Sequence, residues 1–213
     1  MNKPAATIYH NGKMIFYFWP RDISQKKMEK YVNTGVRIVN RGLDAIDHKK
    51  NKNNSQLVLI HTIRSTDLAN LIISNLDDVI KELGVPEDYE LYIATEGLSY
   101  SSVGDATLNL ATYKGVLLSK IYEHYGSNLK RLYTYSPITM KSIAGCANKE
   151  CRGDKLAMIK AFCSLSEVKS PFKDAIVNED LILKKNFVEG VDDLVDSFWA
   201  FKTMIIKENL STK

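Results

Sequence analysis

The amino-acid sequence predicts an α/β protein in which a mixed β-sheet is flanked by helices. Short apolar runs typical of strands lie at residues 5–19, 89–97 and 129–135, and longer runs with helical periodicity follow them. The chain has 213 residues, of which 45% are hydrophobic, so it can bury a sizeable core. Since the sequence has no internal repeat and no second boundary, we expect one domain over residues 1–213.

The first element is a predicted β-hairpin. Residues 5–9 and 13–19 are apolar runs joined through Asn11-Gly12. Asn-Gly between two such runs favours a tight turn because both residues tolerate positive φ. The stretch that follows, about 24–56, is polar and basic, and it predicts an exposed loop.

Two helices are predicted in the middle of the chain. Residues 57–62 have the apolar character of a strand, whereas Ser65 or Thr66 is expected to cap a helix that ends at Gly84. The second helix spans residues 104–125. Small residues recur on it at four-residue spacing, which favours close core packing or, alternatively, a dimer seam. These small residues are Thr107, Ala111, Gly115 and Ser119.

A glutamate stands at the end of the predicted strand at residues 89–97. Glu96 follows an apolar run and precedes Gly97. In α/β sheets, ligands gather at the carboxyl ends of the strands. A carboxylate is costly to bury there unless it is paired, hydrogen-bonded or bound to a cation. Glu96 is therefore a candidate functional carboxylate, and a partly exposed strand-end glutamate is the alternative interpretation.

The most strongly periodic stretch is the predicted helix at residues 191–206. Asp193 and Asp196 lie three residues apart and share one side of its first turn. Asp192 lies about 100° round the helix axis from them, so it is the less favoured third carboxylate of a shared site. Capping is the alternative interpretation, because the helix dipole favours acidic residues in a first turn. Considered together with Glu96, Asp193 and Asp196 become candidate site carboxylates.

A predicted strand at residues 129–135 leads into the last third of the chain. It delivers the chain to Ser136-Pro137, where proline can begin a helix that carries Lys141. Residues 164–190 are expected to be a long, loosely structured connection before the final helix.

The charge is unevenly distributed along a chain of net charge +4. Residues 1–60 hold eleven Lys and Arg against four Asp and Glu, and residues 97–173 hold eleven against five. Basic regions around an acidic focus suit a protein that binds a polyanion while it holds metal ions. A solvated surface with scattered lysines is the alternative.

The sequence contains neither a run of membrane-spanning length nor a secretory signal pattern. Three cysteines in such a chain are typical of reduced intracellular thiols. We therefore expect an intracellular protein that is not secreted and that has no membrane partner.

Two further motifs lie in the last third of the sequence: Gly145 follows Lys141, and Gly153-Asp154-Lys155 stands at the start of a predicted helix. Taken in order over residues 4–204, the motifs resemble the RuvC family of Holliday junction resolvases, most closely its viral or phage branch. The resemblance implies an RNase H-like fold, a homodimer and cleavage of two opposed strands of a four-way DNA junction with Mg²⁺, Mn²⁺ being a plausible substitute. It also implies the host-cell cytoplasm as the compartment if the protein is viral.

The resemblance implies that Glu96, Asp193 and Asp196 match three of the family's four metal-binding carboxylates. Two cations held by shared carboxylates suit phosphodiester hydrolysis, and Mg²⁺ prefers hard oxygen ligands. Lysines beside the phosphate stabilise developing charge. We also expect a basic arm at residues 26–52 to contact DNA phosphates. The lysines matching basic positions near the scissile phosphate, Lys141 and Lys155, are candidate catalytic residues, and the candidate DNA contacts are Lys141, Lys149, Arg152 and Lys155.

Two features depart from the family pattern. The family's first strand and its first catalytic aspartate have no counterpart, since residues 1–8 match the turn and second strand that follow them. We expect either a chain that starts late or an inactive relative, because neither Asp22 nor Asp67 ends a matching strand. The second departure is an insertion after Cys146 that contains Cys151, and both are expected to be plain thiols rather than zinc ligands.

The sequence thus predicts a Mg²⁺-dependent, structure-selective endonuclease that resolves four-way junctions. One alternative is a non-catalytic junction-binding or assembly protein that has lost the first carboxylate. The other is an RNase H-like nuclease that acts on other branched substrates, flaps or RNA–DNA hybrids.

Overall fold

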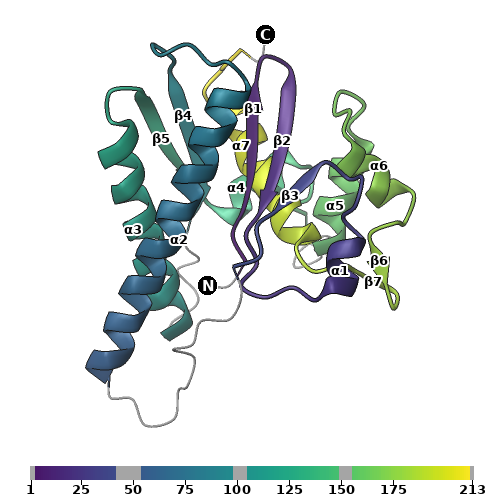
Figure 1. Ribbon diagram of the computed structural model, residues 1–213. Coiled ribbons are helices and arrows are strands. Elements are labelled where there is room, and N and C mark those ends of the chain that lie inside the picture. The colour runs from purple at the N-terminus through teal and green to yellow at the C-terminus, as the bar shows by residue number, and fades with distance from the viewer. Residues whose placement is uncertain (1–2, 42–53, 98–104, 149–154, 212–213) are drawn as a thin grey trace. The chain divides into compact units, whose positions relative to one another are not determined.

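The computed structural model describes residues 3–41, 54–97, 105–148 and 155–211. Within these ranges the chain contains seven helices and seven strands, which confirms the α/β class (Figure 1). It divides into two compact units. Unit 1 comprises residues 44–93 and 98–133, and unit 2 comprises residues 2–43, 94–97 and 134–213. Because segments of the two units alternate along the chain, the single domain over residues 1–213 stays a prediction.

Two long helices pack against each other in unit 1. They are α2 (Asn54–Glu82) and α3 (Asp105–Tyr125). Ile73 of α2 and Ile121 and Tyr125 of α3 are buried between them. In the part of the chain that the structure describes, no helix is both long and apolar enough to cross a lipid bilayer.

The strand predicted at residues 57–62 is wrong, because these residues belong to α2. The β-branched side chains of Val58, Ile60 and Thr62 gave the run its strand-like composition. Helix formation is cooperative, and each residue added to an existing helix contributes a backbone hydrogen bond. The helix that continues to Glu82 therefore extends through a stretch with weak local preference.

Strands β4 (Leu91–Glu96) and β5 (Leu129–Tyr135) pair with each other. The Leu91 N–H donates to the Asn128 carbonyl over 2.8 Å, and the Gly97 N–H donates to the Tyr135 carbonyl over 2.6 Å. The residue numbers increase in both strands between these two contacts, so β4 and β5 are parallel. The predicted strand end at Glu96 is confirmed.

A three-stranded sheet lies in unit 2, in the order β1 (Ala5–His10), β2 (Lys13–Phe18) and β3 (Val36–Ile38). β1 and β2 are antiparallel, and β2 and β3 are parallel. The predicted hairpin is confirmed: Asn11 and Gly12 form the turn with φ of 45° and 80°. Among the described strands, this sheet and the β4–β5 pair are separate, so an RNase H-like sheet stays a prediction.

The basic stretch at about 24–56 is more ordered than a loop where it is described. It contains α1 (Gln25–Glu29) and β3, and the Tyr31 side chain is buried. The apolar residues that neighbour its charges account for this, since they pack onto the core of unit 2. Residues 42–53, the last part of the predicted arm, lie outside the described residues.

The remaining elements of unit 2 follow β5. The prediction of a loosely structured connection over residues 164–190 is wrong, because this segment contains a helix and a two-stranded hairpin. Phe172 and Leu181 are fully buried and anchor the segment to the core. The elements are α4 (Pro137–Ile143), α5 (Lys155–Ser164), α6 (Pro171–Val177), β6 (Ile182–Leu183), β7 (Asn186–Phe187) and α7 (Val191–Lys207).

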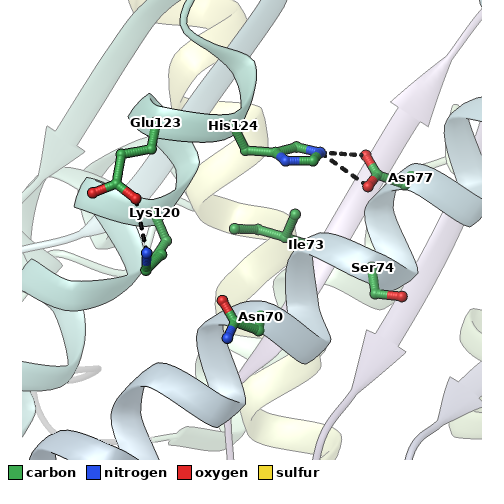
Figure 2. A pocket seen from close by; sticks show the side chains of 7 residues that line it. All are labelled: Asn70, Ile73, Ser74, Asp77, Lys120, Glu123 and His124. Carbon is green, nitrogen blue, oxygen red and sulfur yellow. Dashed lines mark hydrogen bonds and ion pairs between the residues drawn. The ribbon is translucent and has the colours of Figure 1, made fainter.

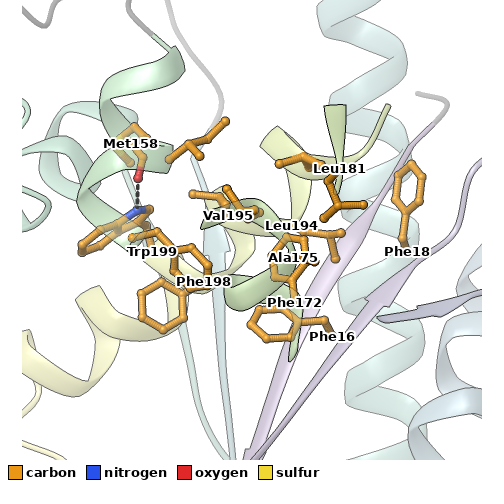
Figure 3. Close-up of a cluster of buried hydrophobic side chains, with 14 of the residues drawn as sticks. Phe16, Phe18, Met158, Phe172, Ala175, Leu181, Leu194, Val195, Phe198 and Trp199 are labelled. Carbon is orange, nitrogen blue, oxygen red and sulfur yellow. Dashed lines mark hydrogen bonds between the residues drawn. The ribbon is translucent and has the colours of Figure 1, made fainter. Parts of the chain in front are cut away.

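Helix α7 is the centre of the unit 2 core and packs against β1, α4 and α5. Figure 3 shows its apolar face among aromatic side chains of the neighbouring elements. The rings of Phe162 and Phe198 lie 4.8 Å apart, and the Trp199 indole donates to the Met158 carbonyl over 3.1 Å. Each such buried side chain contributes roughly 1.5–3 kcal/mol, so the axis and rotation of α7 are fixed. The polar first turn of α7 is fixed with it.

Candidate functional site

The start of α7 is shaped by a glycine. Gly190 precedes the helix with φ of 98°, and its carbonyl accepts a 2.9 Å hydrogen bond from the Leu194 N–H. A Cβ atom at this position would lie 2.5 Å from two carbon atoms of the Phe18 ring. Only glycine combines this left-handed conformation with so close an approach. Gly190 therefore sets where the acidic first turn begins.

The two predicted aspartates in the first two turns of α7 share an unfavourable environment for charge. Burial raises the pKa of Asp193 to about 6, and the neighbouring charge of Asp192 adds to the increase. Burial likewise raises the pKa of Asp196 to about 7, with a further contribution from Glu96. Lys155 partly offsets both shifts. Two half-buried carboxylates in such a site bind protons, or another cation, more readily than exposed ones do.

Glu96 is brought to this cluster from a distant part of the sequence. Its side chain is exposed at the end of β4, and it lies close enough to Asp196 for its charge to raise that pKa. The Gly97 N–H bond to the Tyr135 carbonyl holds the strand end in place. The charges of Glu96 and Asp193 both act on Asp196, so the three carboxylates are linked electrostatically through Asp196. The exposed Glu96 fits the alternative interpretation of a partly exposed strand-end glutamate, and a shared metal site of the three residues stays a prediction.

Lys155 approaches the cluster from the start of α5. Its ammonium group donates to the Asp192 carboxylate. This hydrogen bond raises the pKa of Lys155, and the charges of Asp193 and Asp196 act in the same direction. Asp192 therefore belongs to the cluster, although its position round the helix axis made it the less favoured candidate. Helical periodicity describes one helix, whereas the reach of a lysine from α5 depends on the tertiary fold.

The other predicted basic residues are not brought to the acids by the described part of the chain. Lys141 is half-buried on α4, and among the described residues its side chain makes no ion pair. Its charge is also not among the causes of the shifts at Asp193 and Asp196. Lys149 and Arg152 lie outside the described residues.

A second charged group stands immediately before α7 and was missed by the sequence analysis. The Glu189 carboxylate lies 3.1 Å from the Lys3 ammonium and 2.5 Å from that of Lys27. Burial by itself raises the pKa of Glu189, but hydrogen bonds from these two lysines lower it below its usual value. The Tyr31 hydroxyl donates to the Glu189 carbonyl over 2.8 Å.

The electrostatics of Glu189 extend to the acidic cluster. Burial raises the pKa of Tyr31, and the charges of Asp192 and Asp193 raise it further. The Glu189 charge also contributes to the raised pKa of Asp193. No local pattern could have predicted this group, because its two lysine partners lie more than 150 residues earlier in the chain.

The donor atoms of the cluster suit a hard divalent cation. Carboxylate oxygens are the ligands that Mg²⁺ prefers, and a cation would offset the burial and the repulsion from Glu96 that raise the pKa of Asp196. Among the described residues, however, no group of three or more His, Cys, Asp or Glu side chains converges as a preformed metal site. The fit therefore rests on donor chemistry and charge, and the carboxylates would have to turn toward a shared ion.

The raised pKa values predict how stability depends on pH. A carboxyl group whose pKa is higher in the folded state stabilises the fold below its unfolded pKa, and this stability is lost as pH rises through the folded pKa. For Asp196 the window runs from about 4 to about 7. We expect Asp196→Asn to raise the free energy of unfolding by roughly 2–4 kcal/mol at about pH 8 and to change it little at about pH 4.

Urea unfolding in the presence of a chelator tests this expectation. The exposed Asp22 offers a matched control, since Asp22→Asn removes the same charge from the surface of the same unit. An equal effect of Asp196→Asn at both pH values would contradict the predicted shift.

A separate pocket of about 360 Å³ lies between α2 and α3 in unit 1 (Figure 2). His124 Nε2 lies 3.0 Å from Asp77 Oδ2, and the Tyr125 hydroxyl donates to Asp77 Oδ1 over 2.7 Å. Lys120 and Glu123 form an ion pair of 2.8 Å on the same wall. These charged groups satisfy one another and connect the two helices, so the pocket carries no separate chemical assignment.

Comparison of the chain with protein families, with curated proteins and with solved structures finds no match.

Proposed function

We propose that this protein is a Mg²⁺-dependent, structure-selective endodeoxyribonuclease that resolves four-way DNA junctions by paired phosphodiester hydrolysis. The observation that carries the proposal is the electrostatic cluster of Glu96, Asp193 and Asp196, drawn from a strand end and a helix start nearly 100 residues apart. The resemblance to the RuvC family names the same three residues as metal ligands. Lys155, paired with Asp192, adds a positive group at the edge of this cluster.

The three carboxylates would hold divalent cations, Mg²⁺ or Mn²⁺. When bound, such ions activate water and neutralise charge on the phosphodiester. Lys155 is proposed to contact the scissile phosphate, since it can exchange its aspartate partner for a phosphate oxygen. The same role for Lys141 rests on the resemblance alone. For Lys149 and Arg152 we propose contacts to neighbouring phosphates, which position the DNA without reading its sequence.

A homodimer is part of the proposal, because paired cleavage needs two sites on opposed strands. The small residues at four-residue spacing on α3 support a role in contact with a partner rather than in the protein core. Gly115 and Ser119 are exposed, and a Cβ atom at Gly115 would meet no atom within 4 Å. Core packing therefore does not explain these two small residues, and a dimer seam on α3 remains the proposed alternative.

A second candidate is a non-catalytic protein that binds or assembles on junctions. One observation favours it: among the described residues, no three His, Cys, Asp or Glu side chains converge as a preformed metal site. Such a protein would keep the basic surface and bind branched DNA without cutting it.

A cleavage assay on a synthetic four-way junction with Mg²⁺ tests the proposal, with this chain assayed beside a version extended upstream in its reading frame. Symmetric cuts in two opposed strands by either form support the resolvase. Binding by both forms without cleavage supports the non-catalytic alternative. Preferred cleavage of flaps or RNA–DNA hybrids in a substrate panel would assign the chain to another RNase H-like activity.

A further inference from the structure

The β6–β7 hairpin of unit 2 ends in two lysines. Its strands pair Ile182 with Phe187 and Leu183 with Asn186, which leaves Lys184 and Lys185 as the two loop residues. Both have positive φ, 50° and 68°. Figure 1 shows this hairpin extending away from α6.

The loop conformation is unfavourable for lysine. Residues with a Cβ atom are strained at positive φ, and two-residue turns of this kind strongly prefer Asn-Gly. The same protein provides the comparison, because the β1–β2 turn uses Asn11 and Gly12 at φ of 45° and 80°. Folding alone would favour Asn-Gly in both turns. Strained residues in an ordered loop point to a function for their side chains.

The base of the hairpin is held rigidly. Leu181 and Val188 are 0% and 3% exposed, and the Val188 N–H donates to the Leu181 carbonyl over 2.8 Å. Lys184 and Lys185 are exposed, and within the described residues neither makes an ion pair. The hairpin therefore presents two positive charges on a fixed arm.

The arm leads directly into the candidate site. After Val188 come Glu189, which binds Lys27 of α1, and then Gly190 at the start of α7. Two exposed acids, Glu179 and Asp180, stand at the other end of the hairpin. These acids would repel a polyanion from the α6 side of the base. The lysine tip is then the part of the arm best suited to contact one.

We propose that Lys184 and Lys185 bind the phosphate backbone of DNA a few nucleotides from the acidic cluster. The inference rests on the proposed function, in that it takes the ligand to be DNA. Two strand residues and the turn extend about 10 Å, which corresponds to about three nucleotide steps along one strand. Lysine contacts to phosphates are point-charge interactions and carry no sequence preference.

Replacing the tip by the preferred turn, Lys184→Asn with Lys185→Gly, separates folding from binding. We expect a melting temperature at least as high as that of the wild type, because the strain is relieved. Binding of a labelled four-way junction without Mg²⁺ should weaken about tenfold at about 0.15 M salt. The slope of log affinity against log salt should become shallower by about 1.8, which corresponds to two lost phosphate contacts.

A matched control removes two lysines that are ion-paired on unit 1. Lys120→Asn with Lys130→Asn changes the net charge equally but takes away partners of Glu123 and Glu90. We expect its junction affinity and salt slope to stay close to those of the wild type. A similar loss in both double variants would mean that net charge alone matters, and it would overturn the inference.

The outcomes distinguish the two proposals. Unchanged affinity and slope in the tip variant overturn the hairpin inference and leave the nuclease proposal standing. Weakened binding in the tip variant, together with cleavage that survives Asp193→Asn, supports the hairpin and refutes the acidic site. A wild-type protein that binds no DNA would refute both, and a clear fall in the melting temperature of the tip variant would remove the strain argument.

Discussion

Glu96→Gln and Asp193→Asn are each expected to abolish Mg²⁺-dependent junction cleavage while junction binding remains. Both changes keep the size and shape of the side chain and remove a charged oxygen ligand. The proposed chemistry depends on a shared acidic cluster, so the loss of one member should slow single-turnover cleavage by about 10³-fold or more. Binding depends mainly on basic contacts to phosphates and should be retained.

Asp22→Asn is the control for these variants. Asp22 is exposed in the same unit and has no proposed contact with the cluster, so this variant should cut at the wild-type rate. Melting temperatures are needed beside the cleavage rates to exclude unfolding as a cause. Cleavage that continues unchanged in either Glu96→Gln or Asp193→Asn would refute the acidic site.

Gly190→Ala is expected to have the largest effect on stability. A Cβ atom would meet the Phe18 ring at 2.5 Å, and the φ of 98° is strained for alanine. Positive φ costs about 1–2 kcal/mol, and forcing a methyl group into a packed core costs about 1–3 kcal/mol more. We expect the free energy of unfolding to fall by about 3 kcal/mol, measured by urea unfolding of the whole chain.

Gly115→Ala is the matched substitution at a helical glycine. No atom lies within 4 Å of the added Cβ, and the site is exposed. Alanine in a helix interior is favoured over glycine by roughly 1 kcal/mol, so the variant should be more stable than the wild type when Gly115 faces solvent. A less stable variant, or one that no longer forms a dimer, would instead place Gly115 in the proposed dimer seam. Equal stability of the Gly190→Ala variant and the wild type would contradict the described packing of α7 against Phe18.

The elements that could be predicted from sequence are those with strong local signals. Asn11-Gly12 defines the first hairpin, and the three-and-four spacing of apolar residues defines α7, whose first two turns carry Asp193 and Asp196. The strand that ends at Glu96 was also predictable, because its apolar run stops abruptly at a carboxylate. In each case neighbouring residues agree on one conformation, so the tertiary fold does not override them.

The rest depends on contacts that no local window contains. The β-branched start of α2 became helical through continuation of the helix, and the segment around Phe172 and Leu181 is ordered by the core that it enters. The pairing of Lys155 with Asp192 joins two helices 37 residues apart. Such pairs depend on side-chain reach across the fold, which periodicity along one helix does not describe.

The distribution of tryptophan gives the protein a built-in spectroscopic probe. The chain has two tryptophans, Trp19 and Trp199, and both are buried in unit 2, whereas the long helices α2 and α3 belong to unit 1. Indole fluorescence therefore reports on unit 2 alone, while far-ultraviolet circular dichroism gives weight to the helices of unit 1. Superimposable denaturation curves from the two signals would identify a single cooperative transition, and separated midpoints would identify two.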